Sequence, residues 1–355
     1  METVYTSGEN LREVVRALGT DDNAGGIMLL TTPQTPVIDE VLSELPVPVF
    51  GGKFPAVIAD GEKREQGSVV AKLETEPALT VVPNLSEQPS DITTSLTSET
   101  APRSGTVFVF ADAYATGIDR FIRKLFRTCG TDYNYIGGGA GTLDEQQPSI
   151  YTEDGLVQDA AVVASLDNSS TIGVQHGWKK LAGPFQVTDA DGSTVNSLEH
   201  RPAFRVYQEA IDTNGDHNLT RDEFFDTAKE YPFGISRIDG EAIVRDPFTV
   251  DTDGAITCFG DVPEGEFVHI LTGDTDSLVA AASEAHDEAV SDGSGDTLFF
   301  DCMSRVLYLE DEFDREIEAV NPEIGALTIG EIANDGCGHL DYYNKTAVVL
   351  SLAHN

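Results

Sequence analysis

Cysteine and basic side chains are scarce in this sequence. The 355 residues include only four cysteines (Cys129, Cys258, Cys302 and Cys337), and no two of them form a CxxC pair. The spacing therefore predicts neither a zinc knuckle nor a redox dithiol, and free thiols in a reducing compartment are the default. Lys and Arg number 22 against 61 Asp and Glu, a formal net charge of -39. Because phosphates bind Lys and Arg, this balance argues against a nucleic-acid partner.

Long apolar segments are also missing. No apolar run approaches the ~18 residues needed to cross a bilayer. The first residues, METVYTSGENLREVV, lack the basic and apolar regions of a signal peptide. We therefore expect no membrane partner and a cytoplasmic location. The acidic residues are spread along the whole chain, which we interpret as adaptation to a salt-rich cytoplasm, where screening over about 3 Å suppresses self-repulsion. An acidic partner-binding surface is the alternative.

One pattern occurs three times: an apolar strand, a helix, a glycine-containing turn and two further strands. The copy at 24–75 contains GIMLLTT and VFGGKFP, the copy at 105–167 contains TVFVFAD and YIGGGAGT, and the less similar copy at 296–352 contains TLFFDC and IGALTIGEI. Strands that alternate with helices, together with hairpins, predict an α/β protein with mixed sheets covered by helices. We predict two packed domains, 24–198 and 199–355.

Glycines recur where a strand follows a helix in each copy, so that the backbone can come close to whatever lies there. Their N–H groups could bind an anionic ligand, and tight packing of strands and helices is the alternative. The repetition predicts a ligand cleft built from equivalent loops. The glycines concerned are Gly51, Gly52, Gly137, Gly138, Gly139 and Gly141.

The order of motifs along the chain resembles the FIST family, named for F-box and intracellular signal transduction proteins. The N-terminal part is similar in VFGGKFPAVI, YIGGGAGT and GVQHGWKKLAGPFQVTDADG, and the C-terminal part in RPAFRVYQEA, RDPFTVDTDGAI, LFFDCMSR, GEI and YYNKT. The resemblance implies a sensory module that binds a small ligand, with an amino acid as one candidate. The acidic composition resembles that of a haloarchaeal member. We see no effector domain, so we expect a separate signalling partner such as a histidine kinase.

Five residues of the C-terminal part are candidates for the ligand site. Cys302 and Arg305 follow the strand LFFDC, where α/β folds expose functional groups, and a guanidinium group can hold a carboxylate in bidentate fashion. A structural ion pair is the alternative for Arg305. Glu331, in the GEI turn, could bind a ligand amine or cap a loop. Asn344 and Thr346 could line the same cleft or satisfy the end of a strand.

His176 and Trp178 form a further candidate cluster. Trp178 could form an apolar wall, and His176 could bind a ligand or a metal ion. A few relatives are described as haem-binding nitric oxide sensors, so a haem ligand is the alternative to a structural histidine, which we favour. We expect no required cofactor. The alternative functional class is an enzyme, with Cys302 as nucleophile and His339 or His176 as base. Without a nucleophile elbow, paired catalytic carboxylates or HExxH, we predict a non-catalytic protein.

An acidic stretch, DTNGDHNLTRDE at 212–223, matches the spacing of a twelve-residue calcium loop between two helices. It provides the alternative function of a calcium-responsive binding module. His217 departs from the pattern, because the sixth position normally requires glycine. A solvated acidic loop between two helices is the competing interpretation. The candidate calcium ligands are Asp212, Asn214, Asp216, Asn218 and Glu223.

Overall fold

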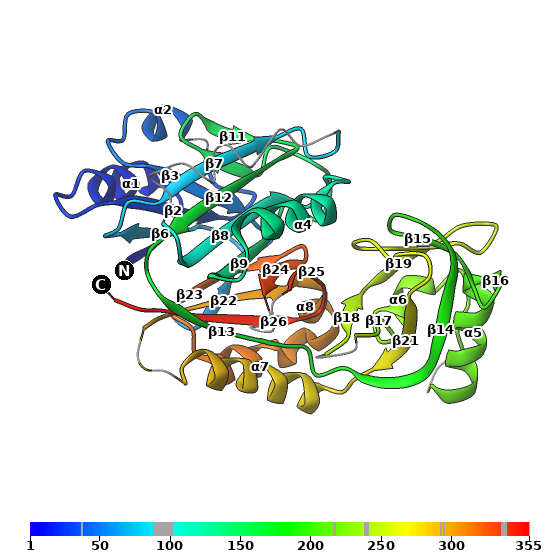
Figure 1. Cartoon of the computed structure of the whole chain (residues 1–355). Coiled ribbons are helices and arrows are strands. Elements are labelled where there is room, and N and C mark those ends of the chain that lie inside the picture. The colour runs from blue at the N-terminus through cyan, green and yellow to red at the C-terminus, as the bar shows by residue number, and fades with distance from the viewer. Residues whose placement is uncertain are drawn as a thin grey trace.

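The computed structural model describes residues 1–36, 38–87, 102–215, 218–237, 241–291, 293, 295–334 and 339–354. It confirms the predicted α/β class, with helices that cover mixed sheets (Figure 1). In these ranges, no helix combines the length and the apolar character needed to cross a lipid bilayer.

Each of the three copies forms a unit with two parallel strands, a hairpin and an antiparallel return strand. The strands of unit 1 are β2 (Gly26–Thr31), β3 (Val49–Lys53), β4 (Ala56–Ala59), β5 (Glu62–Arg64) and β6 (Ser68–Leu73). Those of unit 2 are β8 (Gly105–Asp112), β9 (Tyr133–Ala140), β10 (Ile150–Thr152), β11 (Gly155–Val157) and β12 (Ala160–Leu166). Those of unit 3 are β22 (Asp296–Cys302), β23 (Ile324–Thr328), β24 (Glu331–Asn334), β25 (Leu340–Tyr343) and β26 (Ala347–Leu352).

The units exchange their hairpins in a cycle. The hairpin of unit 1 extends the sheet of unit 3 through β4 and β23, and that of unit 3 extends the sheet of unit 2 through β24 and β9. The hairpin of unit 2 completes the cycle by joining β10 to β3 of unit 1. Each sheet gains one edge strand beside its return strand, so all three have six strands in the same order. The edge strands are β1 (Glu2–Thr6), β7 (Ala78–Pro83) and β13 (Ser170–Gln175). Because no unit completes its own sheet, the three form one body.

Helices cover the outer faces of these sheets, and aromatic side chains fill the space where the sheets meet. The Phe50 and Phe108 rings lie 5.8 Å apart, and Phe110 lies 5.7 Å from Phe300, so all three units contribute to one core. The covering helices are α1 (Leu11–Gly19), α2 (Asp39–Leu42), α4 (Ile118–Cys129), α7 (Thr275–Ala289), α8 (Met303–Leu309), the 3-10 helix η1 (Glu310–Glu312) and α9 (Phe313–Val320).

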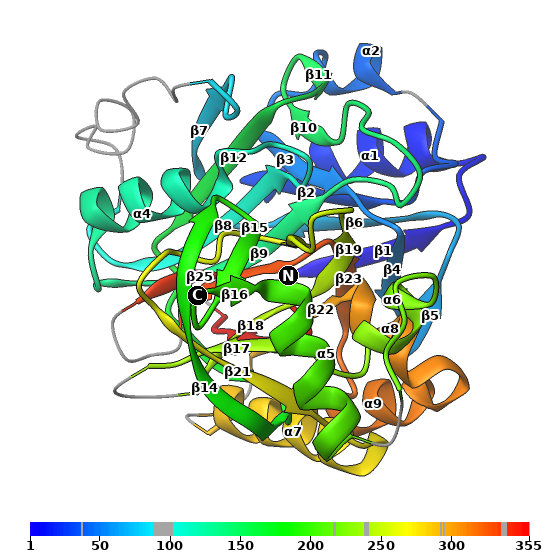
Figure 2. The same ribbon diagram turned by 90° about the vertical axis from the view of Figure 1, so that its right-hand side faces the viewer.

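A second lobe lies beside the three units and is built around a strongly curved sheet (Figures 1 and 2). The long strand β14 (Lys179–Asp191) leads into it. The predicted boundary after Leu198 falls between β15 and β16, which pair with each other, so both sequence halves build this lobe. Its other elements are β15 (Thr194–Leu198), β16 (Arg201–Pro202), α5 (Ala203–Asn214), α6 (Phe224–Ala228), β17 (Phe233–Ile235), β18 (Ile243–Arg245), β19 (Pro247–Val250), β20 (Ile256–Cys258) and β21 (Phe267–Thr272).

Candidate functional site

The repeated glycines permit close packing of parallel strands. Gly51 and Gly137 have φ values of +148° and +151° and occupy equivalent positions in units 1 and 2. A Cβ atom at either position would overlap the carbonyl oxygen of the neighbouring parallel strand, that of Leu29 or Val109. Gly325 has the same relation to its neighbouring strand in unit 3. For these glycines, the contacts favour tight packing of neighbouring strands over an anion-binding site.

The glycines that follow Gly137 bring unit 2 against a turn of unit 3. Gly139 donates its N–H group to the Gly330 carbonyl at 2.8 Å and accepts from the Ile329 N–H group at 2.9 Å. A Cβ atom at Gly138 would lie 2.6 Å from the Thr328 methyl group. Gly141 packs near the Ile329 side chain, whereas Gly52 packs against Phe54 and Ala140 in the core. The glycines of unit 2 therefore position the turn at 328–330.

That turn forms one side of a pocket between unit 3 and the second lobe, which we call the interlobe pocket. Its volume is about 370 Å³, within the size range of small-molecule sites. Unit 3 contributes the end of β22, helix α8, the turn after β23 and the end of β25, while α6 and β19 belong to the opposing lobe (Figure 1). The lining residues are Leu143, Phe225, Phe248, Phe259, Cys302, Met303, Ser304, Leu307, Thr328, Ile329, Gly330 and Asn344.

The walls of the interlobe pocket are apolar. Phe248 and Phe259 stack with their ring centres 4.4 Å apart. Leu143, Phe225 and Leu307 are unusually exposed for large apolar side chains, at 52%, 40% and 39%. Exposed apolar side chains that gather around a concavity are typical of ligand-binding sites.

A buried carboxyl group, that of Glu331, lies beneath the floor of the interlobe pocket and contacts Thr328 of its lining. The Thr328 hydroxyl lies 2.7 Å from Glu331 Oε1 and 3.3 Å from the Asp301 carbonyl oxygen. One hydroxyl proton satisfies both contacts fully only when Glu331 is itself protonated and donates to Thr328. Burial raises the pKa of Glu331 to about 8, which favours this arrangement. Burial, followed by the charge of Glu331, also raises the pKa of the Cys302 thiol, which disfavours a reactive thiolate.

Arg305 lies beneath the floor rather than in the pocket lining. Its guanidinium group is fully buried and donates to Glu316 and to the carbonyl oxygens of His176, Lys345 and Leu278. These contacts are those of the structural ion pair considered as the alternative. The guanidinium group of Arg305 therefore points away from the interlobe pocket.

A second cation, Lys345, is also fully buried beneath the pocket. Its ammonium group lies 3.5 Å from Asp246 Oδ1 and 3.3 Å from the carbonyl oxygen of Ser304. Within the described residues, this buried cluster contains two cations and four carboxyl groups, those of Asp246, Asp301, Glu316 and Glu331. Burial raises the pKa of all four, so protonation can compensate for the excess of acid.

Asn344 and Thr346 flank Lys345. The Asn344 side chain lines the pocket, donates to the Tyr343 carbonyl oxygen at 2.9 Å and accepts from the Asp246 N–H group at 3.4 Å. Thr346 donates its N–H group to Glu331 Oε2 at 3.4 Å and therefore supports the floor. Of the residues proposed from sequence, Cys302 and Asn344 line the interlobe pocket.

His176 and Trp178 line a different, smaller pocket of about 200 Å³. His176 Nδ1 accepts from the Trp178 N–H group at 2.8 Å, which leaves the proton of the neutral ring on Nε2. Burial, and then the positive charge of Arg305, lower the pKa of His176 to about 4. Its carbonyl oxygen supports Arg305, as described above. The structure therefore separates this pair from Cys302 and Glu331.

The acidic stretch at 212–223 begins in the last turn of α5, which ends at Asn214, and ends at the residue before α6. Asp216 and His217 lie outside the described residues. Asp212 Oδ1 accepts from the Leu219 N–H group at 2.9 Å, and Leu219 is buried. Within the described part of the chain, no group of three or more His, Cys, Asp and Glu side chains is arranged to hold a metal ion.

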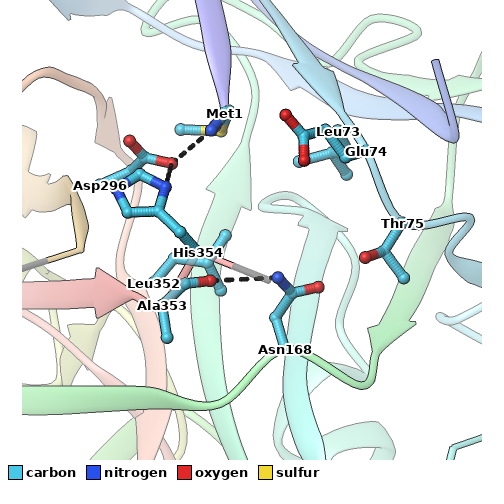
Figure 3. Close-up of a pocket in the computed structure, with 9 residues that line it drawn as sticks. All are labelled: Met1, Leu73, Glu74, Thr75, Asn168, Asp296, Leu352, Ala353 and His354. Carbon is cyan, nitrogen blue, oxygen red and sulfur yellow. Dashed lines mark hydrogen bonds and ion pairs between the residues drawn. The ribbon is translucent and has the colours of Figure 1, made fainter. Parts of the chain in front are cut away.

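A small cavity lies where the two ends of the described chain meet (Figure 3). The Met1 amino group lies 2.6 Å from Asp296 Oδ2, His354 Nδ1 lies 3.6 Å from the same oxygen, and Asn168 donates to the Ala353 carbonyl oxygen at 3.1 Å. Its volume of about 30 Å³ is close to the share of one water molecule in the liquid. It is too small for the ligand of a sensor.

Sequence reasoning did not identify the aromatic side of the interlobe pocket. Phe248 belongs to the RDPF motif and Phe259 follows the next hairpin strand, β20, but their approach to α8 depends on how the lobe packs. Met303 and Ser304, which lie between the predicted Cys302 and Arg305, were the nearest omissions.

The geometry defines a two-lobed α/β protein with a sizeable apolar pocket between its lobes. Residues 26–201 match the FIST N domain, and residues 203–334 match the FIST C domain. The chain therefore belongs to the FIST family, which confirms the resemblance found in its motifs, and FIST domains are sensory modules of signal transduction. No curated protein matches this chain.

Proposed function

We propose that this protein is a non-catalytic cytoplasmic sensor that binds a small molecule in the interlobe pocket and signals to a separate partner such as a histidine kinase. The observation that carries the proposal is the pocket itself, whose walls come from both lobes. A ligand that contacts both walls would stabilise a closed arrangement over an open one. The partner would then bind one arrangement preferentially.

The contacts between the lobes support this mechanism. Arg245, at the end of β18, donates to the Asp261 carbonyl oxygen at 2.9 Å within the lobe. Arg245 also donates to the three repeated units, to the Tyr342 carbonyl oxygen at 2.6 Å and to Asp119 of α4 at 3.3 Å. Phe248 follows Arg245 by three residues. A ligand that moves the Phe248 ring would therefore act directly beside the polar contacts that join the lobes.

A thermal-shift screen of metabolites in concentrated KCl tests the site. A ligand at one hundred times its Kd stabilises the folded state by about 2.7 kcal/mol, which raises Tm. Leu307→Trp should fill the pocket mouth and abolish the response. Val81→Trp is the matched control, because Val81 is similarly exposed and does not line the pocket. Equal responses of wild type and Leu307→Trp would contradict the site.

The second candidate function is the calcium-responsive module. Its support is the arrangement of α5, the loop and α6, with the buried Leu219 joined to Asp212 as described. Calorimetric titration of calcium into wild type and Glu223→Gln at high salt tests it, because Glu223 would be the bidentate ligand. A heat that disappears in the variant supports the module, whereas identical heats exclude it.

A further inference from the structure

We infer that the interlobe pocket binds an uncharged, mainly apolar molecule of one or two rings and selects against free amino acids. This inference rests on the proposed function, because it assumes that the interlobe pocket is the sensory site. It goes beyond it by specifying the ligand's charge and polarity.

The lining provides no counter-ion for a charged ligand. Of the described residues that line the pocket, none carries a formal charge at neutral pH. Arg305 and Lys345 lie beneath the floor and are fully buried, with their donors directed to carboxylates and carbonyl oxygens of the protein. A ligand carboxylate would lose its water without gaining a cation, and burying an unpaired charge is strongly unfavourable.

An ammonium group would gain little either. The carboxyl groups nearest the floor have raised pKa values because they are buried, and Glu331 is protonated over much of the neutral range. With two cations opposite four carboxyl groups, protonation brings the buried cluster towards neutrality. The floor therefore offers no strong negative charge to compensate for the desolvation of an amine.

The floor also has few free hydrogen-bonding groups. One N–H group and the oxygen of the Asn344 amide are engaged with the backbone, which leaves the second N–H group for a ligand, and the Thr328 hydroxyl is engaged with Glu331. The Ser304 side chain lies beside Asp246, and oxygen lone pairs of the two hydroxyls remain as acceptors. This matches a ligand with one O–H or N–H donor and little other polarity.

The size and shape of the pocket set the limit of one or two rings. An apolar cavity of about 150 Å³ holds one benzene ring, and the interlobe pocket has about 370 Å³. The stacked Phe248 and Phe259 rings offer a face to a planar molecule, and aromatic pairs contribute beyond their buried area.

Four phenyl compounds that differ in the head group test the inference. They are 2-phenylethanol, phenethylamine, phenylacetate and phenylalanine, each measured by displacement of the fluorescent neutral two-ring probe 6-propionyl-2-(dimethylamino)naphthalene from the full chain in 2 M KCl. We expect 2-phenylethanol to bind at least tenfold more tightly than each charged compound. Equal or tighter binding of phenylalanine, phenylacetate or phenethylamine would overturn the inference.

Two pairs of variants connect the binding to the pocket. Phe225→Ala should weaken binding of the probe and of 2-phenylethanol about tenfold, and Phe267→Ala, a similarly exposed phenylalanine outside the lining, should leave it unchanged. Leu307→Trp should abolish binding, and Val81→Trp should not.

The two possible failures are distinguishable. If phenylalanine binds tightly and Leu307→Trp abolishes its binding, the site remains and the inferred ligand chemistry is overturned. If the probe binds wild type and Leu307→Trp equally, or binds neither, the interlobe pocket is not the site and both proposals are overturned. Circular dichroism of each variant confirms that it is folded.

Discussion

Replacement of Glu331 by Gln should remove a pH-dependent contribution to stability. Glu331 is fully buried beneath the interlobe pocket, and burial raises its pKa from 4.5 to about 8. Each pKa unit corresponds to about 1.36 kcal/mol, so the full shift corresponds to an upper value of about 5 kcal/mol. Gln cannot ionise, and its neutral amide occupies nearly the same volume.

The sign follows from proton binding in the two states. Between pH 4.5 and about 8, the folded protein retains the Glu331 proton, whereas the unfolded chain releases it. Stability from this group is therefore complete below pH 4.5 and is lost as pH rises to about 8. Near pH 5, the free energies of unfolding of wild type and Glu331→Gln should be similar. At pH 8.5 the free energy of unfolding of the variant should exceed that of wild type by up to about 5 kcal/mol.

Urea unfolding in 2 M KCl from pH 5 to pH 9 measures this difference, which includes the rise in the pKa of Asp301 and Cys302 that the Glu331 charge causes. Glu264→Gln is the control, since Glu264 is exposed and lies outside the buried cluster. Parallel pH profiles of wild type and Glu331→Gln would refute the assignment of a protonated buried carboxyl group.

Three further predictions concern the buried framework. Arg305→Met should lower the free energy of unfolding by about 3–5 kcal/mol in urea titrations, because it leaves Glu316 buried without its cation, and a loss below 1 kcal/mol would contradict the structural ion pair. Cys302 should react with iodoacetamide at pH 7.5 far more slowly in the native protein than in the urea-unfolded chain, because burial raises its pKa; rapid labelling of the native protein, detected by mass spectrometry, would revive the enzymatic alternative. Gly137→Ala should prevent stable folding or lower Tm strongly, because its Cβ atom would overlap the neighbouring strand. Gly130→Ala is the control: no atom lies within 4 Å of the new Cβ, so only its φ of +77° should lower Tm, and by much less. Equal changes in Tm would argue against the packing role of Gly137.

Several features of the site were predictable from local patterns. Cys302 ends an apolar strand that precedes a helix, and such strand ends commonly expose side chains, so its place in the pocket lining followed from the pattern. Asn344 was placed on the final strand, whereas the structure has it in the turn between β25 and β26, where it lines the pocket. Arg305 lies only one turn further along, yet its side chain points into the protein, because the direction of a side chain on a short helix depends on its tertiary neighbours.

The sequence by itself determined the α/β class, the three repeated units and the FIST family, because periodicity, glycine positions and ordered motifs are properties of short segments. Only the tertiary structure decided that the hairpins are exchanged between units and that Phe248 meets α8. Strand pairing and pocket formation join residues far apart in the chain, and the partners are selected by the packing of whole sheets, which no local pattern specifies.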